Sequence, residues 1–136
     1  MTDSPNTTRG KGEVEFIRLL ADRFPHVAAN ISEVEAGLLH LEISMLAKVT
    51  RHAIETEDWD QVRAHFEFVD ELMADASPEL ENAIYVSYLE NVLFGQKTPR
   101  FIAARRMLSR RLEAAMIGLE EHWSKLVEAD RRRRFP

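Results

Sequence analysis

The sequence predicts an all-α protein folded as a single domain. Glycine is scarce, with five residues in a chain of 136. Apolar residues recur at spacings of three and four, which is typical of helices, and the alternation of apolar and polar residues that is typical of strands is almost absent. A hydrophobic content of 45% and a charged content of 30% are typical of a globular chain. Because short connections favour antiparallel neighbours, we expect an antiparallel helical bundle, or a short α-α superhelix, of five to six helices.

The N-terminal part of the chain is expected to hold a polar leader and two helices. Residues 1–11 are polar and are interpreted as a disordered leader, so the helical domain is expected to span residues 12–130. The first helix is predicted over residues 12–24, and Pro25 ends or redirects it. The sequence Asn30-Ile-Ser-Glu33 looks like a capping box and is expected to open a short helix.

Two longer helices are predicted in the middle of the chain. Residues 38–55 are apolar over a wide arc, which is typical of a helix at the centre of a bundle. Asp58 is a suitable N-cap, with Gln61 three residues later, for a helix that runs to about Ala76. The apolar stripe of this helix consists of Trp59, Val62, Phe66, Val69 and Met73.

Two serine- or threonine-proline pairs mark the starts of the last two helices. Ser77-Pro78 places a capping serine before a first-turn proline, and this helix is expected to end near Gly95. Thr98-Pro99 repeats the signal and predicts one long helix from Arg100 to about Asp130, with Gly118 as the place for a kink. Residues 131–136 contain four arginines and are expected to form a basic, frayed tail. The long apolar stripe of this last helix leaves a homodimer open.

The charge of the chain is unevenly distributed. The net charge is −5, whereas residues 55–90 carry −10 and residues 91–136 carry +6. On the helix that follows Asp58, four acids fall on the side opposite the apolar stripe: Asp60, Glu67, Glu71 and Asp75. Arg63 is the only base within residues 55–90. We expect this acidic face to bind a basic protein partner, and the alternative is an ordinary solvated helix face.

The motifs of catalysis, metal binding and membrane insertion are missing. The chain has no cysteine, which excludes disulfides and thiolate ligands, and it has no apolar run long enough to span a membrane. Its five histidines follow no metal-binding spacing and are expected to be surface or helix-capping residues. Ser87 lies in a predicted helix without the glycine elbow of a nucleophile. We therefore expect a cytoplasmic protein that is not an enzyme and needs no cofactor or metal.

Polar residues interrupt the otherwise core-like helix that begins at Ser77. Asn82, Ser87 and Glu90 are polar positions there, and burying such groups without partners is costly. We expect them to form a structural polar network with His40, in which Glu90 bonds to His40 or Arg51 and Ser87 bonds across to another helix. A second hypothesis makes His40 and Glu90 the centre of an unrecognised enzyme site.

Arginines in the last part of the chain suggest another class of partner. Arg105, Arg106, Arg110 and Arg111 form a basic cluster of the kind that neutralises phosphates. The acidic net charge of the chain argues against nucleic-acid binding. Pairing of these arginines with the acidic residues 55–90 inside the fold is the alternative.

Four segments together resemble a known family: His40-Leu-Glu42, Asp58-Trp-Asp-Gln-Val62, Phe66-Glu-Phe-Val-Asp-Glu-Leu72 and Asn82-Ala-Ile-Tyr-Val-Ser-Tyr-Leu-Glu-Asn91. They look like the small all-helical bacterial proteins of the DUF7674 type, over residues 13–95. The resemblance carries no biochemical activity with it. It implies an inhibitor-like role, because such proteins resemble orphan members of toxin–immunity repertoires. We therefore expect a binding protein that neutralises a basic toxin domain through its acidic face.

Overall fold

The computed structural model describes residues 10–134, and within them it contains helices and no strand. The helices are α1 (Glu13–Arg23), α2 (Pro25–Ala29), α3 (Leu39–Glu55), α4 (Trp59–Ala74), α5 (Pro78–Ala83), the π-helix η1 (Ile84–Leu89), α6 (Glu90–Val92), α7 (Pro99–Arg105) and α8 (Arg110–Arg134). Because α5, η1 and α6 follow without a gap, we call residues 78–92 the rod. The predicted all-α fold is confirmed, with α2 and a divided last helix adding to the expected set.

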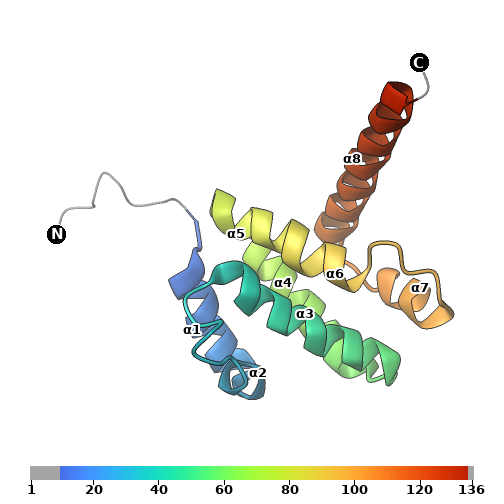
Figure 1. Ribbon diagram of the computed structural model, residues 1–136. Helices are drawn as coiled ribbons and strands as arrows, with labels where there is room; N and C mark the ends of the chain where they lie inside the picture. The colour runs from blue at the N-terminus through green and yellow to red at the C-terminus, as the bar shows by residue number, and fades with distance from the viewer. Residues whose placement is uncertain (1–9, 135–136) are drawn as a thin grey trace, which may run out of the picture.

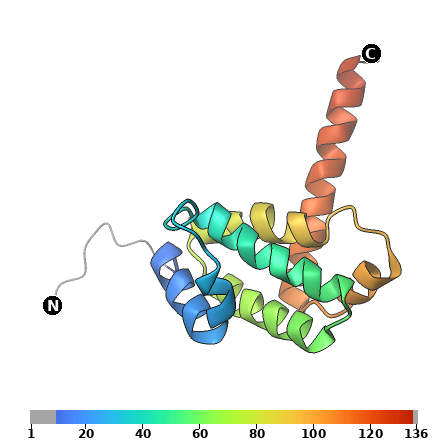
Figure 2. The ribbon, with the colours of Figure 1, turned by 60° about the horizontal axis from the view of Figure 1, so that its bottom comes forward.

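Helix α3 lies at the centre of the fold. It packs against the rod, α4, α7 and α2, and Figures 1 and 2 show it running through the middle of the helical body. Six of its apolar side chains are buried: Leu39, Ile43, Leu46, Ala47, Ala53 and Ile54. The central place predicted from its wide apolar arc is therefore confirmed. Leu38 and Leu41 belong to the same predicted arc but are exposed.

Helix α4 buries a wider face than its predicted stripe. Val62, Phe66 and Val69 are buried as expected, and so are His65, Phe68 and Leu72. The Phe68 ring meets the Phe24 ring edge-on at 5.2 Å between centroids. Aromatic contacts of this kind join α4 to the end of α1.

The N-terminal boundary of the fold differs from the predicted one. Gly10 and Lys11, which were placed in the leader, are attached to the junction between α4 and α5. The Lys11 amide donates to the Asp75 carbonyl (2.6 Å), and the Ser77 amide donates to the Lys11 carbonyl (2.9 Å). Gly10 has a φ of +86°, and an added Cβ there would lie 2.7 Å from the Ala76 carbonyl carbon, so only glycine fits. The rest of the predicted leader, residues 1–9, lies outside the described residues.

The segment between α1 and α3 was predicted only in part. The first helix ends before Pro25, as predicted, because α1 stops at Arg23. Pro25 itself starts the unpredicted helix α2, since proline is tolerated in the first turn of a helix. The expected short helix after Asn30 is a series of turns. The Ser32 amide and hydroxyl both donate to the Glu35 carboxylate (3.0 and 2.7 Å). The bonds join Ser32 to Glu35 and not Asn30 to Glu33, the predicted capping pair. They close a turn, after which Gly37 has a φ of +82°.

The predicted single helix from Arg100 to Asp130 is broken at residues 106–109. Ser109 caps a new helix there, because its hydroxyl accepts from the Leu112 amide (3.1 Å) and donates to the Asp70 carboxylate of α4 (2.6 Å). Arg111 donates to the same carboxylate oxygen (3.1 Å). This anchor to α4 sends α8 off in a new direction, as Figure 1 shows. Helix α8 then continues past Gly118 without a break and past the expected end at Asp130 to Arg134.

The two halves of α8 have different surroundings. Leu112, Ala115, Met116 and Leu119 are buried against the body, whereas every residue from Glu121 to Arg134 is exposed. Figures 1 and 2 show this second half extending away from the other helices. We call residues 120–134 the projecting segment.

The Ser109 anchor generates a first prediction. Ser109→Ala removes the α8 cap and the bond to Asp70, so we expect the free energy of unfolding to fall by about 1–2 kcal/mol. Ser124→Ala is the matched control on the exposed part of the same helix and should change stability by less than about 0.5 kcal/mol. Urea unfolding followed by circular dichroism measures both. Equal effects of the two substitutions would refute the anchor.

Candidate functional site

The most buried polar contacts meet at the Thr50 hydroxyl, where three helices come together. This hydroxyl of α3 donates to the Leu46 carbonyl (3.0 Å). It also lies 2.9 Å from the His65 Nδ1 of α4 and 2.8 Å from the Tyr88 hydroxyl of η1. The Leu46 carbonyl can only accept, so the single proton of the Thr50 hydroxyl is donated to it. The His65 Nδ1 and the Tyr88 hydroxyl must then donate to the two lone pairs of the Thr50 oxygen. The interaction requires a His65 ring that carries a proton on Nδ1.

Burial keeps His65 neutral. The side chain is 1% exposed, and burial lowers its pKa to about 4, against the opposing charge of Asp58. The expectation that the histidines are surface or capping residues is thus wrong for His65. Its position between Val62, Phe66 and Val69 on the apolar face of α4 is the sequence signal that was overlooked.

The structure brings together two of the four residues predicted to form the polar network. His40 Nδ1 lies 2.7 Å from the Ser87 hydroxyl, so α3 is joined to η1 as expected for Ser87. The Ser87 carbonyl accepts from the Asn91 side-chain amide (2.9 Å). Ser87 is buried within the π-helical stretch, where it and Tyr88 both face α3. The wider π turn explains how two neighbouring residues both make interhelical bonds.

Asn82 and Glu90 do not belong to that network. Neither makes a side-chain hydrogen bond or ion pair to residues 10–134, and Asn82 is exposed. The two residues share a face, as predicted from their spacing, but this face is turned away from α3. It borders a groove between the rod and α8, and solvent can satisfy their polar groups there. Glu90 makes no hydrogen bond or ion pair with its expected partners, His40 and Arg51, and His40 bonds to Ser87 instead.

This groove has a volume of about 540 Å³. The rod contributes Asn82, Tyr85, Val86 and Glu90 to its walls. The other wall, from α8, consists of Gly118, Leu119, His122 and Trp123. We call it the α5–α8 groove. Its floor is mostly apolar, and Glu90 supplies a negative charge at its edge.

A second hollow flanks the other side of α8. It has a volume of about 450 Å³, and Phe94, Trp123 and Val127 contribute apolar surface to it. The Trp123 ring is tilted against the Phe94 ring at 5.9 Å between centroids. Trp123 therefore belongs to both concave surfaces at the foot of the projecting segment.

Three of the four acids of the predicted acidic face on α4 form ion pairs, one within the helix and two with bases from elsewhere in the chain. Asp60 pairs with Arg63 at 3.4 Å, Glu71 with Arg23, and Asp75 with Lys11 at 3.5 Å. Glu67 is exposed and has no ion pair among residues 10–134. Arg63 is the only base within residues 55–90, but Lys11 and Arg23 reach α4 from the N-terminal part of the chain and compensate two further acids.

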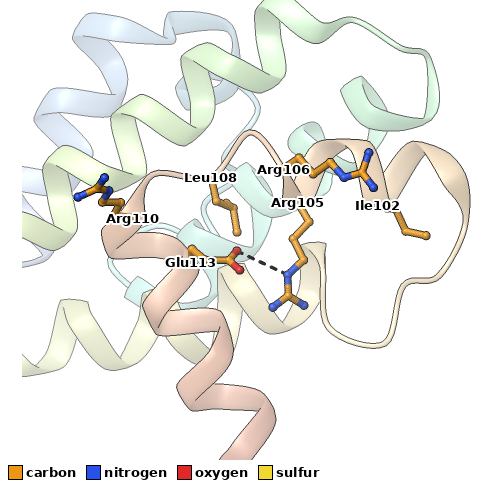
Figure 3. Close-up of a pocket in the computed structure, with 6 residues that line it drawn as sticks. All are labelled: Ile102, Arg105, Arg106, Leu108, Arg110 and Glu113. Atoms are coloured by element: carbon orange, nitrogen blue, oxygen red, sulfur yellow. Dashed lines mark ion pairs between the residues drawn. The ribbon is translucent and has the colours of Figure 1, made fainter.

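The arginines of the predicted basic cluster are also engaged in separate ion pairs. Arg105 is bound to Glu120 through two hydrogen bonds and lies 3.6 Å from Glu113, and Arg111 binds Asp70. Figure 3 shows Arg105 directed toward Glu113, whereas Arg106 and Arg110 point in different directions. The alternative pairing of arginines with the acidic residues is thus found for Arg111, and for Arg100 with Glu57 at 3.6 Å. The four arginines do not form one continuous phosphate-binding surface.

Glu42 is a buried carboxyl group that sequence reasoning noted only as a neighbour of His40. It is 1% exposed, and its Oε2 accepts from the Gly37 amide (2.9 Å). Its Oε1 has no partner in the part of the chain that the structure describes. Burial raises the pKa of Glu42 to about 7, and Glu13 contributes to this rise, while the Gly37 bond opposes it.

A family model described as a domain of unknown function, DUF7674, matches residues 17–124. The chain belongs to the DUF7674 family. No match was found among curated proteins or among solved structures. The matched region extends beyond the resemblance seen at residues 13–95 and includes the α5–α8 groove, while most of the projecting segment follows it.

Residues 10–134 contain neither a metal-binding cluster nor a membrane-spanning helix. No three His, Asp or Glu side chains lie close enough together to hold a metal ion. None of the described helices combines the length and apolar composition needed to cross a bilayer. The candidate sites in the described residues are the Thr50 contacts in the core and the concave surfaces beside α8.

The Thr50 contacts generate a second prediction. Thr50→Val leaves two buried donors without an acceptor, so we expect the free energy of unfolding to fall by about 3 kcal/mol. Thr50→Ser keeps the hydroxyl and should cost about 1 kcal/mol. Asn82→Ala on the exposed side of the rod should cost less than about 0.5 kcal/mol. Chemical denaturation measures all three, and a Thr50→Val protein as stable as Thr50→Ser would contradict the proposed network.

A third prediction concerns pH. His65 binds its proton more weakly in the folded state, so its contribution to stability is lost as pH falls from 6.5 toward 4. Glu42 binds its proton more tightly in the folded state, so its contribution is lost as pH rises from 4.5 toward 7. The two dependences oppose each other and largely cancel between pH 5 and 6.5.

Substitution of either group should expose the dependence of the other. As pH rises from 5 to 6.5, the free energy of unfolding of His65→Gln should fall by about 1–2 kcal/mol. That of Glu42→Gln should rise by a similar amount over the same interval. Each variant is compared with itself at different pH values. The pH-independent effect of the substitution on the free energy of unfolding therefore cancels. Urea unfolding at several pH values gives the slopes. Slopes of the same sign in both variants would show that this assignment is wrong.

Proposed function

We propose that this DUF7674 protein is a cytoplasmic, non-enzymatic binding protein that takes a basic helical segment of a partner protein into the α5–α8 groove. The activity we propose is immunity-like inhibition of a toxin. The single observation that carries the proposal is an apolar groove of about 540 Å³ with a carboxylate at its edge. A helix with one apolar face is a common occupant of such grooves in proteins.

The apolar part of the groove supports protein binding. Tyr85 and Leu119 contribute apolar surface from opposite walls, and Val86 is 44% exposed. Trp123 adds an aromatic side chain, the type most enriched among residues that dominate binding energy. Removing this surface from water would provide the main driving force for association.

The charge of the rod, of which Glu90 lines the groove, supports a basic partner. Glu79, Glu81 and Glu90 lie on the rod, and none of them makes an ion pair with residues 10–134. On α4, by contrast, most acids are held by Lys11, Arg23 and Arg63. The uncompensated part of the negative charge of residues 55–90 therefore includes the rod. A basic partner is steered toward uncompensated charge more strongly than toward existing ion pairs.

The test is calorimetric titration of the full chain with the purified product of the adjacent gene. Val86→Asp should weaken binding by roughly tenfold or more, and Glu90→Lys should weaken it and reduce its salt dependence. Ile102→Asp is the matched control, because Ile102 on α7 is also 44% exposed but lies outside the groove. Circular dichroism checks that each variant is folded.

A second set of variants separates the groove from the acidic face of α4. The double variant Glu67→Lys, Glu71→Lys should bind with nearly unchanged affinity if the groove is the contact. The proposal would be contradicted if this double variant bound the partner much more weakly while Val86→Asp and Glu90→Lys bound it with unchanged affinity. That result would show that the contact surface is on α4.

A further inference from the structure

The π-helix η1 places Tyr85 and Glu90 on the same side of the rod. The Glu90 amide donates to the Tyr85 carbonyl, five residues earlier, and this is the hydrogen bond that defines a π turn. Residues joined in this way lie one turn apart, whereas five residues along an α-helix amount to about 140° of rotation. The π turn therefore brings both side chains to one face, and both line the α5–α8 groove.

The α8 wall of the groove adds a second aromatic side chain to this pair. Trp123 lies there one turn after Leu119, and 36% of its surface is exposed. Phe94 packs against the Trp123 ring at 5.9 Å between centroids, which holds the indole at the groove while part of it stays accessible. Two aromatic rings and one carboxylate therefore line a single concave surface.

The polar groups of these three side chains are not used inside the fold. The Glu90 carboxylate makes no ion pair with residues 10–134, and the rod itself contains no lysine, arginine or histidine. The Tyr85 hydroxyl and the Trp123 indole N–H make no hydrogen bond within the same residues. A concave surface of about 540 Å³ that combines apolar walls with a few convergent polar groups is typical of a ligand site.

Among basic groups, a guanidinium matches this combination best. A guanidinium is planar and stacks on the faces of tryptophan and tyrosine rings, which attract cations. Its N–H groups can bind one carboxylate through two parallel hydrogen bonds. The ammonium of lysine is compact and more strongly hydrated, so it gains less from a flat aromatic surface. The chemistry of the groove therefore favours arginine over lysine.

We propose that Tyr85, Glu90 and Trp123 form a subsite for the guanidinium group of an arginine in the basic segment of the partner protein. The guanidinium pairs with the Glu90 carboxylate and stacks on the aromatic rings, and the apolar stem of the arginine lies along Val86. The inference rests on the proposed function in assigning this arginine to a partner protein. Binding of the guanidinium group itself can be measured on the chain alone.

Titration of the full chain with propylguanidinium, followed by heteronuclear NMR spectroscopy, tests the subsite. The chain has two tryptophans, so the indole N–H resonance of Trp123 reports on the groove, and that of Trp59, which lies outside it, is an internal reference. Propylguanidinium should shift the Trp123 resonance alone, with a dissociation constant on the order of millimolar for so small a ligand. At equal ionic strength, the uncharged analogue propylurea and the lysine analogue butylammonium should each bind roughly fivefold more weakly.

Two substitutions test the residues of the subsite. Glu90→Gln keeps the size of the side chain and removes its charge, so it should weaken the binding of propylguanidinium roughly fivefold. Tyr85→Leu removes one aromatic face and should also weaken it. Glu67→Gln is the matched control, because it removes an exposed, unpaired carboxylate of α4 that lies outside the groove, and it should leave binding unchanged. Circular dichroism checks that each variant is folded.

Three results would overturn the inference: a Trp123 resonance that does not shift, an analogue that binds as tightly as propylguanidinium, or a Glu90→Gln protein that binds it as the wild type does. Because these measurements use the chain alone, each of these results leaves the titration with the partner protein as a separate test of the proposed function. Conversely, if propylguanidinium binds as expected and the partner protein does not bind, the proposed function fails while the subsite stands.

Discussion

The fold depends on one hydroxyl group, that of Thr50, because it is the point where α3, α4 and the rod are joined in the absence of water. Three polar contacts use all of its hydrogen-bonding capacity. A buried network that is fully satisfied fixes the rotation and register of its helices, whereas apolar packing alone tolerates small slips. The rod is thereby held with Ser87 and Tyr88 toward α3. The same rotation turns Asn82, Val86 and Glu90 outward, and so it determines which residues line the groove.

The sequence predicted the elements whose signals are local. The caps at Asp58 and Ser77 and the apolar periodicities of α3 and α4 placed these helices within a few residues. Features that depend on tertiary contacts were missed. The break before α8 requires Asp70, which is far from Ser109 in the chain, and the burial of His65 requires Thr50 and Tyr88. Of the predicted polar residues, His40 and Ser87 meet, whereas Asn82 and Glu90 do not, because helix periodicity gives a shared face but not the neighbour that the face meets.

The uneven distribution of charge along the chain has a structural role that is not evident from the sequence. Negative charge within residues 55–90 suggested an uncompensated surface, but Lys11, Arg23 and Arg111 approach α4 from both ends of the chain. Exposed ion pairs of this kind contribute little stability individually, but they offset part of the negative charge of that helix. On the rod, by contrast, Glu79, Glu81 and Glu90 make no ion pair with residues 10–134. Glu90 is the charged part of the proposed binding surface.

The central claim is that the α5–α8 groove is covered by another protein. Amide hydrogen exchange of the full chain, alone and with the partner protein present, tests this claim most directly, because it reports on the groove walls themselves. The account predicts that the partner protein slows exchange in the rod and at residues 118–123 of α8, with the core amides of α3 unchanged. Equal exchange of these residues with and without the partner protein, under conditions where the two proteins bind, would contradict the account.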